Sequence, residues 1–111
     1  MKVVCDLDGT LNADPELYRG ELRGLMERGH EVHILTGDPM AQHLLAQLGF
    51  VKNRDFTCVA VIPRKNIAAT KVAYMKRVGA TTMIDNRKKN IKAARRAGFT
   101  CQHHLPPKKK D

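Results

Sequence analysis

The sequence contains no tryptophan, and its other aromatic residues are only two Tyr and three Phe among 111 residues. A surface that stacks single-stranded bases needs several aromatic side chains, so no stacking platform is evident. Long apolar runs are also missing, because the longest, residues 59–62, has the length of a strand and not of a membrane span. We therefore expect no membrane partner.

Cysteine is scarce, and its number is odd. Cys5, Cys58 and Cys101 each lie in a short apolar run, where cysteine usually behaves as a small buried hydrophobe. We expect all three to be reduced. The N-terminal residues lack the long apolar stretch and cleavage site of a secretory signal, so the expected location is the cytoplasm.

The patterns of several common chemistries are also missing. Cys101 lies close to His103 and His104, but no second pair of ligands has the spacing of a zinc site, so these histidines are expected in a polar tail. The sequence has no Ser-His-Asp arrangement and no glycine-rich dinucleotide loop.

Acidic residues are few in the second half of the chain. Residues 1–51 hold 4 Lys/Arg and 8 Asp/Glu, a net charge of −4, whereas residues 52–111 hold 16 and 3, a net charge of +13. Such an asymmetry is typical of a protein with one face that meets a polyanion, although basic faces are also often only solvated.

Strand and helix patterns alternate through the chain. The helices are marked by Asp-Pro starts, apolar positions at helical spacing and glycine stops. We expect strands at 2–6, 32–35, 56–62, 81–85 and 99–101, and helices at 15–28, 39–48, from 66 or 70 to 78, and 87–97. This order predicts a doubly wound, three-layer α/β sandwich with a five-stranded parallel sheet. We expect one domain, residues 1–102, and a flexible basic tail, residues 103–111.

Carboxylates end two of the expected strands. Asp6 and Asp8 end the first, Thr36 ends the second and Asp85 ends the fourth. If these three strands are neighbours, their side chains converge beyond the carboxyl edge of the sheet, where such folds bind ligands. Three close carboxylates favour a hard cation such as Mg²⁺, and Lys71 would add a donor for phosphoryl oxygens. A metal ion, a carboxylate nucleophile and a phosphate-binding lysine together are typical of an enzyme that catalyses phosphoryl transfer.

Four short motifs follow one another along the chain. They contain Asp6-Leu7-Asp8-Gly9-Thr10, then Thr36-Gly37, then Lys71, and then Asp85-Asn86. This pattern resembles the haloacid dehalogenase (HAD) superfamily, whose fold is Rossmann-like. The first motif is the most specific of the four. The compact sequence around Lys71 is similar to the branch that holds deoxyribonucleotidases and polynucleotide kinase phosphatase domains.

The resemblance implies a role for each motif residue. Asp6 would attack phosphorus and form an aspartyl-phosphate, and Asp8 would be the general acid and base. The implied phosphate-binding residues are Gly9, Thr10, Thr36, Gly37 and Lys71, and the implied Mg²⁺ site comprises Asp6, the Asp8 main-chain carbonyl, Asp85 and Asn86. A carboxylate at position 8 is what phosphatases of this superfamily carry.

The fourth motif departs from the superfamily pattern, and the identity of the phosphate-binding lysine has two candidates. Where a second acid is common in the fourth motif, this chain has Asn86 and Asn90, which predicts weaker Mg²⁺ affinity. Lys65 lies close to the same expected sheet edge and is the alternative to Lys71.

No cap domain is expected, because core strands and helices fill the intervals between the motifs. An open site admits large substrates. With the basic second half, this favours a nucleotide or a nucleic-acid end as the phosphorylated substrate. The alternatives are a non-enzymatic basic nucleic-acid-binding module and a phosphoprotein phosphatase. The sequence does not determine the oligomeric state.

Overall fold

The computed structural model describes residues 1–105. Five parallel strands form one sheet in the order β3-β2-β1-β4-β5. The strands are β1 (Lys2–Asp6), β2 (Glu31–Thr36), β3 (Cys58–Val61), β4 (Thr82–Asp85) and β5 (Thr100–His103). The predicted five-stranded parallel sheet is confirmed.

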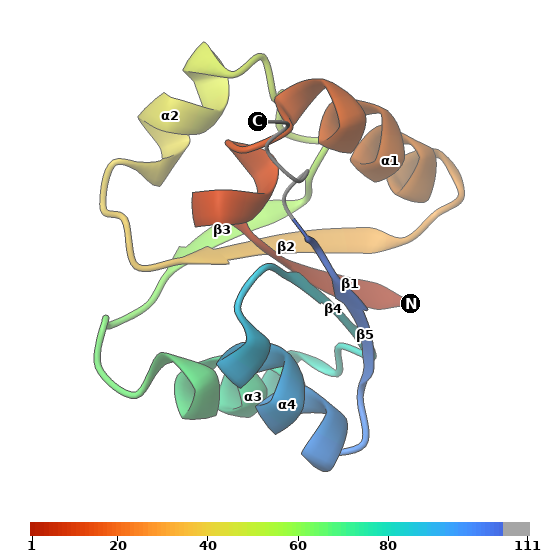
Figure 1. Ribbon diagram of the computed structural model, residues 1–111. Helices are drawn as coiled ribbons and strands as arrows, with labels where there is room; N and C mark the ends of the chain where they lie inside the picture. The colour runs from red at the N-terminus through yellow and green to blue at the C-terminus, as the bar shows by residue number, and fades with distance from the viewer. Residues whose placement is uncertain (106–111) are drawn as a thin grey trace, which may run out of the picture.

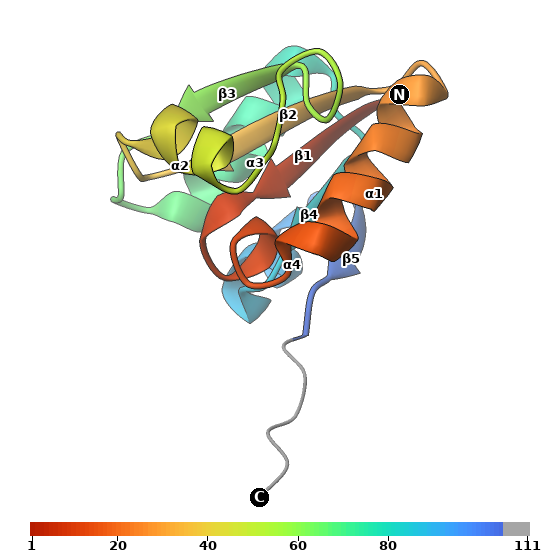
Figure 2. The ribbon, with the colours of Figure 1, turned by 90° about the horizontal axis from the view of Figure 1, so that it is seen from above.

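Helices cover both faces of this sheet. They are α1 (Pro15–Glu27), α2 (Ala41–Gln47), α3 (Ile67–Val78) and α4 (Lys88–Arg96), and a wide helical turn, η1 (Leu7–Leu11), follows β1. Helices α1 and α2 lie on one side of the sheet, and α3 and α4 lie side by side on the other (Figures 1 and 2). The doubly wound three-layer sandwich is therefore also as predicted. No helix in the described part of the chain is long and apolar enough to span a membrane.

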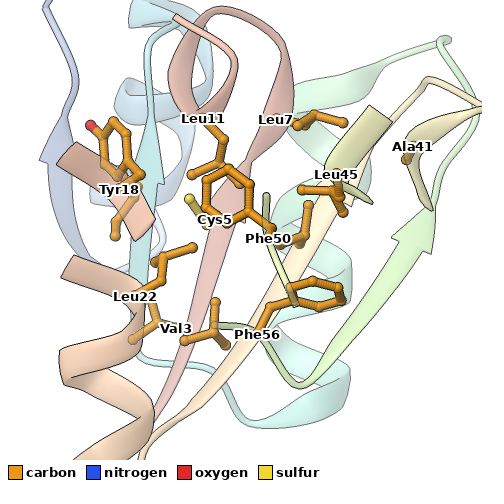
Figure 3. Close-up of a cluster of buried hydrophobic side chains, with 13 residues drawn as sticks. Val3, Cys5, Leu7, Leu11, Tyr18, Leu22, Ala41, Leu45, Phe50 and Phe56 are labelled. Carbon is orange, nitrogen blue, oxygen red and sulfur yellow. The ribbon is translucent and has the colours of Figure 1, made fainter. Parts of the chain in front are cut away.

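Side chains of the central strands alternate between two apolar cores. On β1, Val3 and Cys5 enter the core beneath α1 and α2, and Val4 enters the core beneath α3 and α4. The first core packs Leu22 and Phe50 against the sheet (Figure 3). Because both faces are covered, successive residues in the middle of β1, Val3, Val4 and Cys5, are all apolar and buried.

The predicted end signals hold for α1 and α3, but the helix expected from residue 39 is wrong at its start: Asp38 accepts a hydrogen bond from the Met40 backbone N–H in a turn, and α2 begins at Ala41. The Asp14 side chain accepts a hydrogen bond from the Leu17 backbone N–H, and Pro15 occupies the first helical position of α1. At the end of α3, Gly79 has φ +76°, a conformation that glycine adopts without strain.

Strand β3 differs from the expected strand 56–62. It contains only four residues, and Val61 is 52% exposed. The apolar residues of 56–62 would suit a strand buried on both faces, and that interpretation is wrong. The strand lies at the edge of the sheet, where the covering helices leave it half exposed.

The C-terminal strand is longer than predicted. Strand β5 includes His103, and His104 is buried with its Nδ1 2.7 Å from the Tyr18 hydroxyl. The polar-tail interpretation of these two histidines is thus wrong, and the sheet extends one residue beyond the expected boundary at residue 102. The rest of the predicted tail, residues 106–111, lies outside the described residues.

Candidate active site

The last residues of three neighbouring strands meet at one edge of the sheet. Asp6 ends β1, Thr36 ends β2 and Asp85 ends β4, and β1 lies between the other two. Chain progression reverses here, since β2 and β3 extend to one side of β1 and β4 and β5 to the other. This is the crevice in which doubly wound folds bind ligands.

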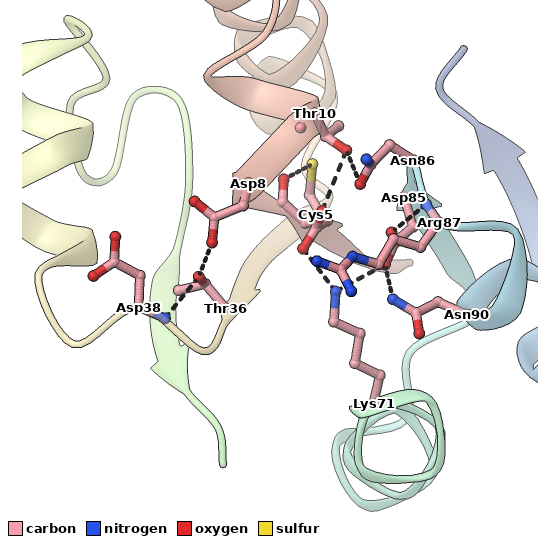
Figure 4. A network of polar contacts seen from close by, with 12 residues as sticks. Cys5, Asp8, Thr10, Thr36, Asp38, Lys71, Asp85, Asn86, Arg87 and Asn90 are labelled. Atoms are coloured by element: carbon pink, nitrogen blue, oxygen red, sulfur yellow. Dashed lines mark hydrogen bonds and ion pairs between the residues drawn. The ribbon is translucent and has the colours of Figure 1, made fainter. Parts of the chain in front are cut away.

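Lys71 connects two of these strand ends. Its Nζ lies 2.8 Å from Asp6 Oδ1 and 2.8 Å from Asp85 Oδ2 (Figure 4). Asp85 is fully buried, and it also accepts hydrogen bonds from the Asn90 amide and the Arg87 backbone N–H. Lys65, the alternative lysine, is exposed, so the structure brings Lys71 and not Lys65 to the strand ends.

Burial and neighbouring charges have opposite effects on the pKa values of Asp6 and Lys71. Burial raises the pKa of Asp6 from 3.8 to about 6, the neighbouring Asp85 charge adds to the rise, and the Lys71 ammonium opposes it. Burial alone would lower the pKa of Lys71, but the two carboxylates raise it above its usual value. Lys71 therefore stays charged at neutral pH while it holds one oxygen of Asp6.

The turn after β1 is shaped by Gly9. Its φ is +79°, and a Cβ atom built there would lie 2.3 Å from Asn86 Nδ2. The missing side chain lets Asn86 approach the β1 end from β4. The Thr10 hydroxyl lies 3.4 Å from Asp6 Oδ2 and 3.4 Å from the Asn86 amide, so the turn closes over the second oxygen of Asp6.

Asp8 points away from Asp6 and toward β2. Its Oδ2 accepts a hydrogen bond from the Thr36 hydroxyl at 3.4 Å, and Thr36 Oγ1 in turn accepts one from the Asp38 backbone N–H (Figure 4). Thr36 is 1% exposed, whereas Asp8 is exposed. The two carboxylates of the first motif thus have different surroundings, one buried and paired and one open to solvent.

The three expected carboxylates do not gather into one cluster. Among residues 1–105, no three His, Cys, Asp or Glu side chains lie close enough together to bind a metal ion. Asp8 is turned toward Thr36, and Lys71 Nζ lies between Asp6 and Asp85 and is bonded to both. Any cation at this edge would have to use other oxygens as well.

Asn86 supplies such an oxygen. One amide atom of Asn86 lies 2.8 Å from Asp6 Oδ2 and 3.1 Å from the Asp8 carbonyl oxygen, and without a metal the nitrogen takes this place because it donates to both. With the amide reversed, three oxygens face one another. Neighbouring oxygens around octahedral Mg²⁺ are about 3.0 Å apart for bonds of about 2.1 Å, so these residues fit the ion.

A cavity of about 340 Å³ opens over these residues. Asp6, Asp8, Gly37 and Lys71 line it, as do four residues to which sequence reasoning gave no site role: Asp38, Arg64, Ile67 and Arg87. Asp85, Thr36 and Thr10 lie beneath its surface.

Sequence reasoning missed Arg64, and it counted Arg87 only among the basic residues after the fourth motif that favour an anionic substrate. Arg64 Nε donates to the Gly37 carbonyl at 3.0 Å, and a Cβ on Gly37 would lie 2.6 Å from Arg64 Cγ. Each arginine follows the carboxyl end of a strand within a few residues, a position that could have marked both as candidates.

Two sequence comparisons find no relative for this chain. No protein-family model matches it, and no curated protein matches it.

The fold, in contrast, has counterparts among solved structures. Two structures of the Pnkp1/Rnl/Hen1 RNA repair complex contain chains that match 93% of this chain with a TM-score of 0.64, at 19% and 20% sequence identity. A HAD family enzyme from Bacteroides thetaiotaomicron, an aspartate-to-alanine mutant in complex with magnesium and inorganic phosphate, matches 84% with a TM-score of 0.59 and 15% identity.

These likenesses show that the chain has a HAD-like fold. The match covers 42% and 45% of the two repair-complex chains and 55% of the Bacteroides enzyme, so this chain spans about half the length of the solved chains it matches.

Proposed function

We propose that this protein is a Mg²⁺-dependent phosphohydrolase that cleaves phosphate monoesters through an aspartyl-phosphate on Asp6. One observation carries the proposal. Asp6 lies buried at the base of an open cavity, with Oδ1 held by Lys71 and Oδ2 facing the Asp8 carbonyl and the Asn86 amide. A carboxylate whose two oxygens have separate partners can bind a cation with one oxygen and react with the other.

In the first step, Asp6 Oδ1 attacks phosphorus and the bond between phosphorus and the ester oxygen breaks. Asp8, exposed on the other side of the cavity, donates its proton to the leaving alkoxide. Lys71 and the two cavity arginines, Arg64 and Arg87, balance the negative charge of the phosphoryl oxygens.

In the second step, water attacks the aspartyl-phosphate. Asp8 now accepts the proton of that water, the bond between phosphorus and Asp6 breaks, and inorganic phosphate leaves. The Thr36 hydroxyl supports both steps by donating to Asp8 Oδ2, which fixes the direction of the carboxylate. Asp85 acts through Lys71 by holding its ammonium 2.8 Å from Asp6.

Asp6 Oδ2, the Asp8 carbonyl and the Asn86 amide oxygen would hold the metal. Asp85, the fourth implied ligand, would have to exchange its hydrogen bond with Lys71 or the Arg87 N–H for the ion. Bound Mg²⁺ supplies charge stabilisation for the phosphoryl group. The amide in place of a second carboxylate contributes less negative charge, so we propose a modest Mg²⁺ affinity.

The proposed substrates are nucleotides or nucleic-acid ends. The intervals between the motif residues are occupied by the core elements α1, α2 and β3, which leaves no room for an inserted cap. Arg64 and Arg87 at the cavity rim favour a substrate with negative charge beyond the reacting group.

Phosphate release from a panel of substrates tests the proposal. The panel holds mononucleotides, oligonucleotides phosphorylated at either end, a sugar phosphate and a phosphopeptide, each with Mg²⁺ or EDTA. We expect Mg²⁺-dependent release that Asp6→Asn abolishes and that Asp8→Asn reduces strongly. Release that survives in Asp6→Asn would contradict the assigned nucleophile, and no release from any substrate would favour a binding module on the same fold.

A further inference from the structure

A second and larger cavity, of about 620 Å³, lies beside the candidate active site between the start of α3 and α4. Five cationic side chains line it: Arg64, Arg87, Lys89, Lys92 and Arg96. No acidic residue occurs among the described residues of this lining. We call this cavity the α3–α4 groove.

The groove adjoins the candidate active-site cavity. Arg64, Ile67, Arg87 and Asn90 line both. A strand whose terminal phosphate reaches Asp6 would therefore meet the groove next. The two helices that form its walls pack side by side on the same face of the sheet (Figure 1).

The charges on α4 are arranged along one side of the helix. Lys89, Lys92 and Arg96 are spaced three and four residues apart, which places them on the same side of a helix. Lys88 and Arg95 belong to the same helix but do not line the groove. The groove-facing cations thus form a row that leads away from the active site.

The protein does not neutralise this row. Within residues 1–105, none of the five cations forms an ion pair, although Arg23 and Arg54 both pair with Asp55 elsewhere on the surface. Arg64 has one polar contact, to the Gly37 carbonyl. Like charges held close together repel, and an anionic ligand relieves that repulsion.

The chemistry of the lining identifies the occupant. A mononucleotide would place its one phosphate at Asp6 and leave the row of cations empty, whereas a nucleic-acid strand carries further phosphates at regular spacing. The described lining has no aromatic side chain on which a base could stack, so contacts would be to the backbone and independent of base sequence. A phosphopeptide lacks the regular negative charge.

We propose that the α3–α4 groove binds the phosphodiester backbone of a nucleic-acid strand whose terminal phosphate monoester reaches Asp6. The inference rests on the proposed phosphatase function and narrows its substrate to a strand end. It assigns Lys89, Lys92 and Arg96 to substrate binding and not to the chemical step.

The test compares two double variants of one helix. Lys92→Gln with Arg96→Gln removes two groove cations, and Lys88→Gln with Arg95→Gln removes one lysine and one arginine outside the groove. Binding of a fluorescent single-stranded oligonucleotide is measured by anisotropy in EDTA over a range of salt concentrations, with RNA and DNA probes in parallel. Urea unfolding of each variant checks that the fold is retained.

Each lost phosphate contact lowers the slope of log affinity against log salt by about 0.7 for a single strand, so we expect the groove variant to lose about 1.4. Between about 50 and 200 mM salt, the wild type should then lose about sevenfold more affinity than the groove variant. The control variant should keep the wild-type slope. A slope shared by all three proteins would overturn the proposal.

Turnover separates this inference from the proposed function. We expect the ratio of kcat/KM for a phosphorylated oligonucleotide to that for p-nitrophenyl phosphate to fall about tenfold in the groove variant and to be unchanged in the control. Salt-dependent binding of the oligonucleotide without phosphate release would refute the proposed phosphatase function, but it would still support the groove as a nucleic-acid-binding site. If phosphate is released but this kcat/KM ratio is the same in the wild type and the groove variant, the groove proposal alone is refuted. Faster release from the phosphopeptide than from the oligonucleotide would refute it as well. A difference between the RNA and DNA probes identifies the strand.

Discussion

The buried carboxylate of Asp6 should reduce the stability of the metal-free protein, and Asp6→Asn should reveal by how much. Asp6 is 8% exposed, and burial raises its pKa from 3.8 to about 6 despite the Lys71 ion pair. Each tenfold change in proton affinity corresponds to about 1.4 kcal/mol, so the ionised carboxylate costs up to about 3 kcal/mol of folding free energy. An uncharged amide of the same shape avoids that cost.

The sign follows from proton linkage. Because the folded-state pKa is raised, the native state binds more protons than the unfolded state between pH 3.8 and about 6. The contribution of Asp6 to stability is fully present below the unfolded pKa and is lost as pH rises through the folded pKa. The advantage of Asp6→Asn should therefore be small near pH 4 and complete above about pH 7.

Urea unfolding in EDTA measures this effect. With a slope of about 1.5 kcal/mol per molar urea, we expect the Asp6→Asn midpoint to lie about 1 to 2 M above that of the wild type at neutral pH. Asp8→Asn is the matched control, because it removes a carboxylate from the same cavity at an exposed position and should shift stability by less than about 0.5 kcal/mol. A less stable Asp6→Asn at neutral pH would refute the reasoning, since the Lys71 attraction would then exceed the cost of burial.

Three further perturbations address the other parts of the site. Lys71→Met leaves two buried carboxylates without their cation and should lower the free energy of unfolding by about 3 to 5 kcal/mol, whereas Lys65→Met should change it by less than about 0.5, as measured by urea unfolding. Gly9→Ala puts a Cβ 2.3 Å from Asn86 at φ +79° and should cost about 1 to 3 kcal/mol, and an unchanged thermal midpoint would contradict this. Asn86→Asp adds a carboxylate facing Asp6 Oδ2 and should raise Mg²⁺ affinity, which calorimetry would contradict if the two proteins bound the ion equally.

Local signals in the sequence determined most of the fold. The alternation of apolar side chains on β1, the cap and proline that begin α1 and the glycine that ends α3 are short-range features, so they are legible without a structure. The four motifs were also legible, because parallel strands place their carboxyl ends at one edge and Asp6, Thr36 and Asp85 each end a strand.

Tertiary structure alone decided the details of the site. Spacing along the chain could not show that Lys71 Nζ lies between Asp6 and Asp85, or that Asp8 turns away from both toward Thr36. It could not show that Arg64 donates to the Gly37 carbonyl beside the cavity, nor that the Tyr18 hydroxyl contacts the ring of the buried His104. These contacts join residues far apart in sequence, and their formation depends on how helices pack across the sheet. The sequence by itself thus determined which groups end the strands, whereas the packing decided which of them touch and where, within residues 1–105, a row of unpaired cations remains.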